Sequence, residues 1–192
     1  MNKNLLIAAA LTSGRLHALP ARTRTIPAHL ADAAAEFEET LATFVTVLDP
    51  VLARVHANIE KHGLHLTGVF PADSPAPAEH EWYTYTTGLG ARLGFELALA
   101  TLPFEVAGPI LHHAATLLTA TPSEGDLVEG LLGSGYTARL HRCTDTRRFA
   151  TTRRIYGSDP VDGVWQIVVP DADGRFPDEP GYNHDGLPQP LY

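Results

Sequence analysis

The residues best suited to do chemistry lie on one charged turn: Asp171, Asp173 and Arg175. They follow the apolar run 164–169 and surround Gly174, so a strand should deliver two carboxylates and a guanidinium onto a tight turn. Charge beside a buried strand is costly unless it is paired. One interpretation is structural, with Asp171 capping the turn and Arg175 bound to a carboxylate. The other is a ligand-binding turn.

The spacing of this turn does not fit a calcium loop. An EF-hand places glycine sixth and glutamate twelfth, whereas Gly174 is the fourth residue from Asp171 and Arg175 follows it. The histidines also fit a metal poorly, because His112 and His113 are adjacent on an expected helix and helical chelation needs an i, i+4 pair. We therefore expect no metal and no cofactor.

A second group of polar candidates lies on residues 83–87 and the strand after them. Tyr85 and Thr87 share one face of an expected strand, and Glu96 lies within an otherwise apolar strand. An ionised Glu96 would need a partner there, and Arg175 is the simplest one, with a surface position of Glu96 as the alternative. The candidate ligand-binding residues are Tyr85, Thr87, Glu96, Gln166, Asp171, Asp173 and Arg175.

Cys143 is the only cysteine, and it shares a strand face with His141. A thiolate nucleophile needs a base within hydrogen-bond reach, whereas same-face neighbours on a strand are about 7 Å apart at Cα. We expect Cys143 to be a core residue, with catalysis as the lesser alternative. A single cysteine permits no intramolecular disulfide, which favours a reducing cytoplasm.

Composition and charge limit the classes of partner. The chain has 192 residues, of which 44% are hydrophobic and 19% charged, so it can bury a core. Its net charge of −8 argues against nucleic acid and membrane surfaces as partners, and no run approaches the ~20 apolar residues of a membrane span. Six arginines lie within 136–157, and the tail 159–192 is acidic. This asymmetry predicts an anionic partner or a tail folded over the arginines.

The elements that must position these residues begin with a helical region. Apolar side chains recur at spacings of three and four over 30–59, and Asp49-Pro50 should kink or break the helix. We expect residues 1–62 to form an α-helical extension. Its apolar face at 30–59 should bind a protein partner or form a homo-oligomer.

Residues 63–192 predict a separate α+β domain. Alternating and apolar runs indicate strands at 63–70, 81–87, 95–101, 136–143 and 164–169, and helices are expected at 103–119 and 146–156. Several strands follow one another through short glycine turns, which antiparallel pairing permits. The fold should therefore be a mainly antiparallel sheet packed by helices.

Several motifs occur in order along this domain. They are Tyr85-Thr86-Thr87-Gly88-Leu89, Phe95-Glu96-Leu97, Leu102-Pro103-Phe104-Glu105, the run 166–177 and Gln189-Pro190-Leu191. Together they resemble the bacterial family called domain of unknown function 4262, and the resemblance implies this fold without implying an activity. In two departures, Asp178 stands where the family usually has an aromatic residue, and the loop 71–80 is longer than usual.

Two classes of function remain open. The first is a binding or interaction module for a protein or anionic partner, immunity-type proteins included, because the charged motifs lie on turns without a recognisable nucleophile and base. The alternative is a small hydrolase or transferase in which the Tyr85 strand and the turn at 171–175 form one polar site. That alternative requires the two regions to converge in the fold.

Overall fold

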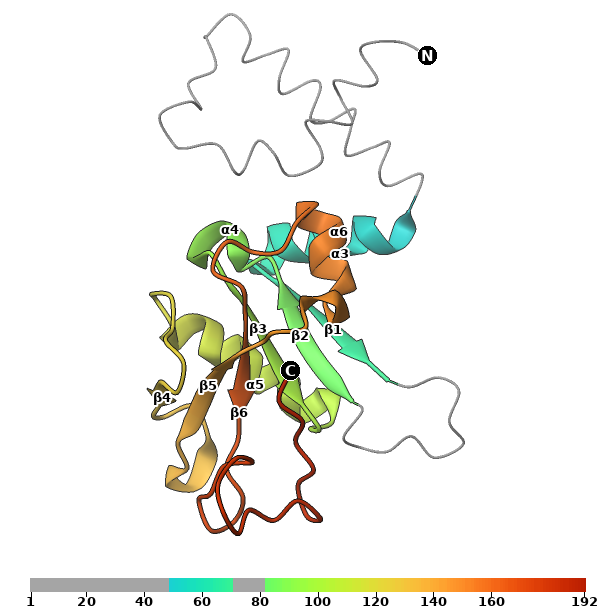
Figure 1. Cartoon of the computed structure of the whole chain (residues 1–192). Coiled ribbons are helices and arrows are strands. Elements are labelled where there is room, and N and C mark those ends of the chain that lie inside the picture. The colour runs from blue at the N-terminus through green and yellow to red at the C-terminus, as the bar shows by residue number, and fades with distance from the viewer. Residues whose placement is uncertain (1–48, 71–81) are drawn as a thin grey trace, which may run out of the picture.

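Figure 1 shows the computed structural model of the chain, which describes residues 49–70 and 82–192. A six-stranded sheet has the order β1-β2-β3-β6-β5-β4, and of its neighbouring pairs only β3 and β6 run parallel. The predicted α+β fold with a mainly antiparallel sheet is therefore confirmed. The strands are β1 (His65–Val69), β2 (Tyr83–Thr87), β3 (Glu96–Ala100), β4 (Leu127–Val128), β5 (Ala138–Arg142) and β6 (Val164–Val168).

One face of the sheet is covered by helix α5 (Phe104–Leu117). Leucines, tryptophan and isoleucine of β3, β5 and β6 form this core. The helix buries small residues, among them Ala107, Gly108 and Ala114, which allow its backbone to approach the sheet closely. Apolar periodicity over 103–119 predicts inner residues at Phe104, Val106, Ile110, Leu111, Ala114 and Leu117. Of these, Leu111 and Ala114 are buried, whereas Phe104, Val106 and Leu117 are exposed. Close packing of small side chains decides which face of α5 is buried.

The other face carries a second core made of tyrosines and small residues. Tyr83 and Tyr85 of β2 pack with Phe149 and Tyr192, over Ala98 of β3. Phe149 immediately precedes the short helix α6 (Ala150–Tyr156), which lies against β2, so this segment and the C-terminal Tyr192 both contribute to the core. The helical turn α4 (Gly90–Leu93) connects β2 to β3.

Helix α3 (Pro50–His62) begins where the sequence predicted an interruption. Oδ1 of Asp49 accepts the backbone amides of Val51 and Leu52 at 3.0 and 3.2 Å, so Asp49 is the N-cap and proline occupies the first turn. Val55 is the buried residue of α3, which packs against β1. The rest of the expected face at 30–48 lies outside the described residues. Within the described residues, no helix is both long enough and apolar enough to cross a membrane.

Candidate functional site

Glu96 lies at the start of β3 and is fully buried. Its Oε1 accepts the backbone amides of Gly88 and Gly90, each at 2.8 Å, and the Tyr156 hydroxyl at 2.6 Å. The Thr86 hydroxyl donates to Oε2 at 2.6 Å. Burial raises the pKa of Glu96 above its ordinary value, and these four hydrogen bonds oppose the rise. All four partners are donors, so the carboxylate organises the turn between β2 and β3 and retains no free role in binding.

The predicted ion pair between Glu96 and Arg175 is wrong. Arg175 instead donates to Oδ2 of Asp173 and to the carbonyl of Gly181, both at 3.0 Å. Glu96 stands opposite Val164 at the start of β6, whereas Arg175 follows the end of that strand. The two side chains therefore belong to opposite ends of the sheet, and the expected convergence of the Tyr85 strand with the turn at 171–175 does not occur.

Asp171 performs the structural role considered for it. Its Oδ1 accepts the amides of Asp173 and Arg175 at 2.9 Å, and its Oδ2 accepts the amide of Asn183 at 3.0 Å. The backbone hydrogen bond from Arg175 is the main reason that the pKa of Asp171 lies below its ordinary value. Gly174 has φ of 81°, as this tight turn requires. The turn is thus held by its own carboxylate.

Gln166 is buried on β6 and binds the end of the chain. Its side-chain amide donates to the Pro190 carbonyl at 2.7 Å and accepts the Tyr192 amide at 3.0 Å. Gln189, which lies in the tail, bonds back to the end of β6. Its side-chain amide accepts the Val169 amide and donates to the Val169 carbonyl. The two glutamines therefore attach the tail to β6 as an additional strand would.

Tyr85 and Thr87 hold helix α6 in place. The Tyr85 hydroxyl accepts the amide of Thr151 at 3.1 Å, and the Thr87 hydroxyl lies 2.8 Å from that of Thr152. Cys143 is buried, and burial raises the pKa of its thiol to about 12, which makes it unsuitable as a nucleophile. Tyr85 and Thr87 therefore each have a structural partner, and neither they nor Cys143 line the two cavities described below.

A charged cleft lies beside β5, on the sheet face opposite α5. We call it the β5 cleft. Its cavity has a volume of about 320 Å³. It is lined by Glu124, Gly125, Arg139, His141, Asp178 and Leu191. These residues come from a turn, a strand and two parts of the tail, so segments distant in the sequence meet around one cavity, as is usual for ligand sites.

The strand supplies the basic residues of the β5 cleft. Arg139 and His141 are two positions apart, so both point away from the core side of β5, which Leu140 occupies. The Arg139 guanidinium pairs with Asp178 and Glu179 and lies 4.2 Å above the centre of the Phe176 ring. Sequence analysis missed this site, although the alternation of Arg139 and His141 on one strand was a usable signal.

Glu124 orients His141. Its two carboxylate oxygens contact His141 Nδ1 at 2.8 Å and the backbone amide of Arg142 at 2.7 Å. Partial burial opposes ionisation, but these hydrogen bonds hold the pKa of Glu124 below its ordinary value. An ionised carboxylate only accepts, so Nδ1 of His141 donates and Nε2 remains for another partner.

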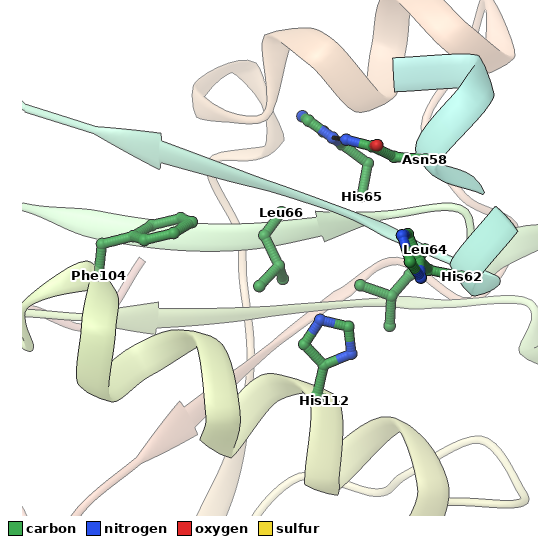
Figure 2. A pocket seen from close by; sticks show the side chains of 7 residues that line it. All are labelled: Asn58, His62, Leu64, His65, Leu66, Phe104 and His112. Carbon is green, nitrogen blue, oxygen red and sulfur yellow. Dashed lines mark hydrogen bonds between the residues drawn. The ribbon is translucent and has the colours of Figure 1, made fainter. Parts of the chain in front are cut away.

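A second concavity, which we call the β1 groove, has a volume of about 310 Å³. It is lined by Asn58, His62, Leu64, His65, Leu66, Phe104 and His112 (Figure 2). Asn58 Nδ2 lies 2.9 Å from His65 Nδ1, so this ring nitrogen accepts, and burial lowers the pKa of His65. Despite the three histidines, no cluster suited to a metal ion occurs within 49–70 and 82–192.

Comparison with known proteins assigns the domain to a family. The family model described as Domain of unknown function (DUF4262) matches residues 58–183, which is most of the chain. No curated protein and no solved structure gives a significant match. The motifs of that span supply Glu96, Asp171 and Gln166, whose hydrogen bonds hold the turn between β2 and β3, the turn at 171–175 and the tail. The chain therefore belongs to the DUF4262 family.

Proposed function

We propose that this protein is a binding module and that the β5 cleft receives a cationic group of its partner. The distribution of charge in the cleft carries the proposal. The side chains of Glu124 and Asp178 are 61% and 55% exposed, whereas those of Arg139 and His141 are 19% and 25% exposed. A molecule entering from solvent therefore meets carboxylates first, and Leu191 offers apolar surface to an alkyl chain. Lysine and arginine side chains and small alkyl amines have this chemistry.

The arginines support a cationic rather than an anionic partner. Of the six between positions 139 and 154, five are paired with carboxylates of the same chain. Asp159, Asp178 and Glu179, from the acidic tail, supply three of these partners. This favours the tail folding over the arginines, one of the two sequence-based interpretations of the charge asymmetry, and leaves few guanidinium groups for a phosphate or carboxylate.

Titration of ¹⁵N-labelled full-length protein with defined probes tests the proposal. We expect Nα-acetyl-lysine methylamide, whose side-chain amine is free and charged, and agmatine to shift the amide resonances of residues 124–126, 139–142 and 178–179. Glu124→Gln and Asp178→Asn should each weaken binding about three- to tenfold, because an opposite charge is lost at a partly exposed site. Asp159→Asn is the matched control, since Asp159 pairs with Arg153 outside the cleft.

The two sources of cation are separated by comparing probes. Tighter binding of a lysine-containing peptide than of agmatine would identify a protein partner, and the reverse would identify a small amine. Stronger shifts with phosphate than with either cation would contradict the proposal, as would shifts that are insensitive to both substitutions.

The hydrolase alternative keeps one supporting observation, which is the contact between Glu124 and His141. A carboxylate at Nδ1 leaves Nε2 of His141 able to take a proton from water, as in other carboxylate–imidazole pairs. No serine, threonine or cysteine side chain hydrogen-bonds His141 among the described residues, so water would be the nucleophile. If this holds, His141→Gln should abolish turnover of an ester panel and preserve binding of the cationic probes. The wild-type protein would show no turnover if the cleft only binds.

Two further parts of the proposal concern context. We propose a cytoplasmic location, for which the single buried Cys143 is the support. We also propose that the face at 30–59 contacts a protein partner or another copy. Its described part is the first three turns of α3, where Val51 is exposed. We further propose that residues 1–62 form an extension of a domain that comprises residues 63–192.

A further inference from the structure

The imidazole ring of His141 is held in one orientation at the wall of the β5 cleft. His141 lines the cavity, and its Nδ1 lies 2.8 Å from Oε1 of Glu124. The ionised carboxylate can only accept, so Nδ1 carries a proton, and in the neutral ring Nε2 carries the lone pair. Among the described residues, no protein group donates to Nε2. The cleft therefore holds a neutral hydrogen-bond acceptor beside two carboxylates.

The other accessible polar atoms of the cleft are mainly acceptors as well. The side chains of Glu124 and Asp178 are 61% and 55% exposed, and each carboxylate has more lone pairs than its contacts within the chain use. The guanidinium of Arg139 is a donor, but it is 19% exposed and is bound by Asp178 and Glu179. A ligand that fits this cleft must therefore supply N–H groups as well as positive charge.

The β5 cleft lacks the aromatic faces that bind a cation without N–H groups. Quaternary ammonium groups are recognised by cages of aromatic rings. Among the lining residues that the structure describes, His141 alone has a ring. Phe176 is close by, but the guanidinium of Arg139 lies 4.2 Å above the centre of its ring and covers that face. A cation in this cleft is therefore held by hydrogen bonds rather than by ring faces.

We propose that His141 is the specificity-determining residue of the β5 cleft: its Nε2 accepts an N–H of the bound cation, so that the cleft takes protonated amines and guanidinium groups and rejects quaternary ammonium groups. This assignment rests on the proposed function and adds which cations the cleft distinguishes. The carboxylates attract every cation, whereas a neutral acceptor interacts favourably only with an N–H. An analogue that lacks the donor leaves Nε2 unpaired, and sites built on hydrogen bonds reject analogues for this reason.

A methylation series of one probe tests this assignment at constant charge. We expect Nα-acetyl-lysine methylamide and its Nε-monomethyl and Nε-dimethyl forms to bind the full-length protein at about pH 8, where histidine is ordinarily neutral. The Nε-trimethyl form should bind about tenfold more weakly than the dimethyl form. These two forms differ by one methyl group, but only the dimethyl form has an N–H. An affinity that falls evenly with each added methyl, or does not fall, would overturn the inference.

Two substitutions separate the acceptor from the rest of the ring. His141→Leu removes the acceptor, so the dimethyl and trimethyl forms should then bind within about twofold of each other. His141→Gln keeps a carbonyl that can accept and an amide that can donate to Glu124, so it should retain most of the preference. Unchanged binding of the trimethyl form by His141→Leu serves as the control for folding. A preference that survives His141→Leu would overturn the inference.

The pH profile of the wild-type protein gives a readout that needs no variant. Histidine ordinarily gains a proton between about pH 8 and pH 5, and an imidazolium both loses its acceptor and repels a cation. The hydrogen bond from Arg139 is the main reason that the pKa of Asp178 is lowered, and the pKa of Glu124 is lowered despite partial burial. Both carboxylates therefore stay ionised in this range, and Arg139 stays charged. Affinity for the unmethylated probe should fall about tenfold on acidification, and far less in His141→Gln. A flat wild-type profile would overturn the inference.

Failure of this assignment and failure of the proposed function give different results. If no cationic probe shifts the amide resonances of the β5 cleft, the proposed function is wrong and the role of His141 fails with it. If all four forms of the lysine probe shift those resonances with equal affinity, the proposed function stands and only the role of His141 is overturned.

Discussion

The carboxylate of Glu96 and the carboxylates of the β5 cleft have opposite environments. Glu96 is fully buried and accepts four hydrogen bonds from two hydroxyls and two backbone amides. In the cleft, Glu124 and Asp178 keep most of their surface in solvent while they hold His141 and Arg139. A saturated, buried carboxylate contributes to folding, whereas an exposed one over an oriented base can still interact with a ligand. The difference separates a carboxylate that holds the fold from carboxylates that we propose bind a ligand.

The largest effect is expected from Glu96→Ala. The substitution leaves four buried donors without their acceptor and opens a cavity, so we expect a loss of about 3–5 kcal/mol in the free energy of unfolding. Chemical denaturation followed by circular dichroism measures it, with Glu105→Ala on the exposed start of α5 as the control. A loss below about 1 kcal/mol would mean that the carboxylate does not hold the β2–β3 turn.

Gln166→Ala should have the next largest effect. It removes two buried hydrogen bonds to the tail and leaves a small cavity, so we expect a loss of about 2–4 kcal/mol. Exchange of the Tyr192 amide should accelerate, because that amide loses its acceptor. Gln189→Ala provides a comparison, since it should release Val169 instead. Unchanged exchange at Tyr192 would show that the tail is held by other contacts.

The pH dependence of the stability of Asp171→Asn tests whether the Asp171 carboxylate holds its turn. The pKa of Asp171 is lowered from 3.8, so its contribution to stability is present above that pH and is lost as the pH falls through the lower, folded-state value. We therefore expect the variant to melt below the wild type at pH 7. The gap should narrow as the pH falls below 3.8 and close once the pH lies below the folded-state pKa, where the wild-type carboxyl is protonated. Thermal melts from pH 7 into the acid range measure it, and a constant gap would contradict this explanation.

The smallest change in stability is expected in the β5 cleft. Glu124→Gln and Asp178→Asn remove exposed charges, and exposed ion pairs contribute about 0–1 kcal/mol. Their melting temperatures should therefore stay close to that of the wild type while binding of cationic probes weakens. A loss of stability as large as that of Glu96→Ala would place these residues with the architectural group and remove the contrast.

Local patterns located most of the elements, although not β4 or α4. Alternating and apolar runs identified β1, β2, β3, β5 and β6 within a few residues, and the interruption predicted at Asp49-Pro50 is where α3 begins. The buried face of α5 was assigned only in part, because apolar periodicity correctly included Leu111 and Ala114 but also favoured the exposed Phe104. Among the candidate site residues, the capping role of Asp171 was foreseen because its partners lie within its own turn, apart from Asn183.

The sequence by itself determined the α+β class, the family and the positions where charge requires a partner. Only the tertiary structure decided which partners those are. Glu96 binds Thr86, Gly88, Gly90 and Tyr156 instead of Arg175, and Arg139 meets Asp178 from the tail. Periodicity reports how residues a few positions apart share a face, but it holds no information on which distant segments the sheet order brings together. The β5 cleft exists because β6 lies between β3 and β5, and this order places the tail across the face that Arg139 and His141 occupy.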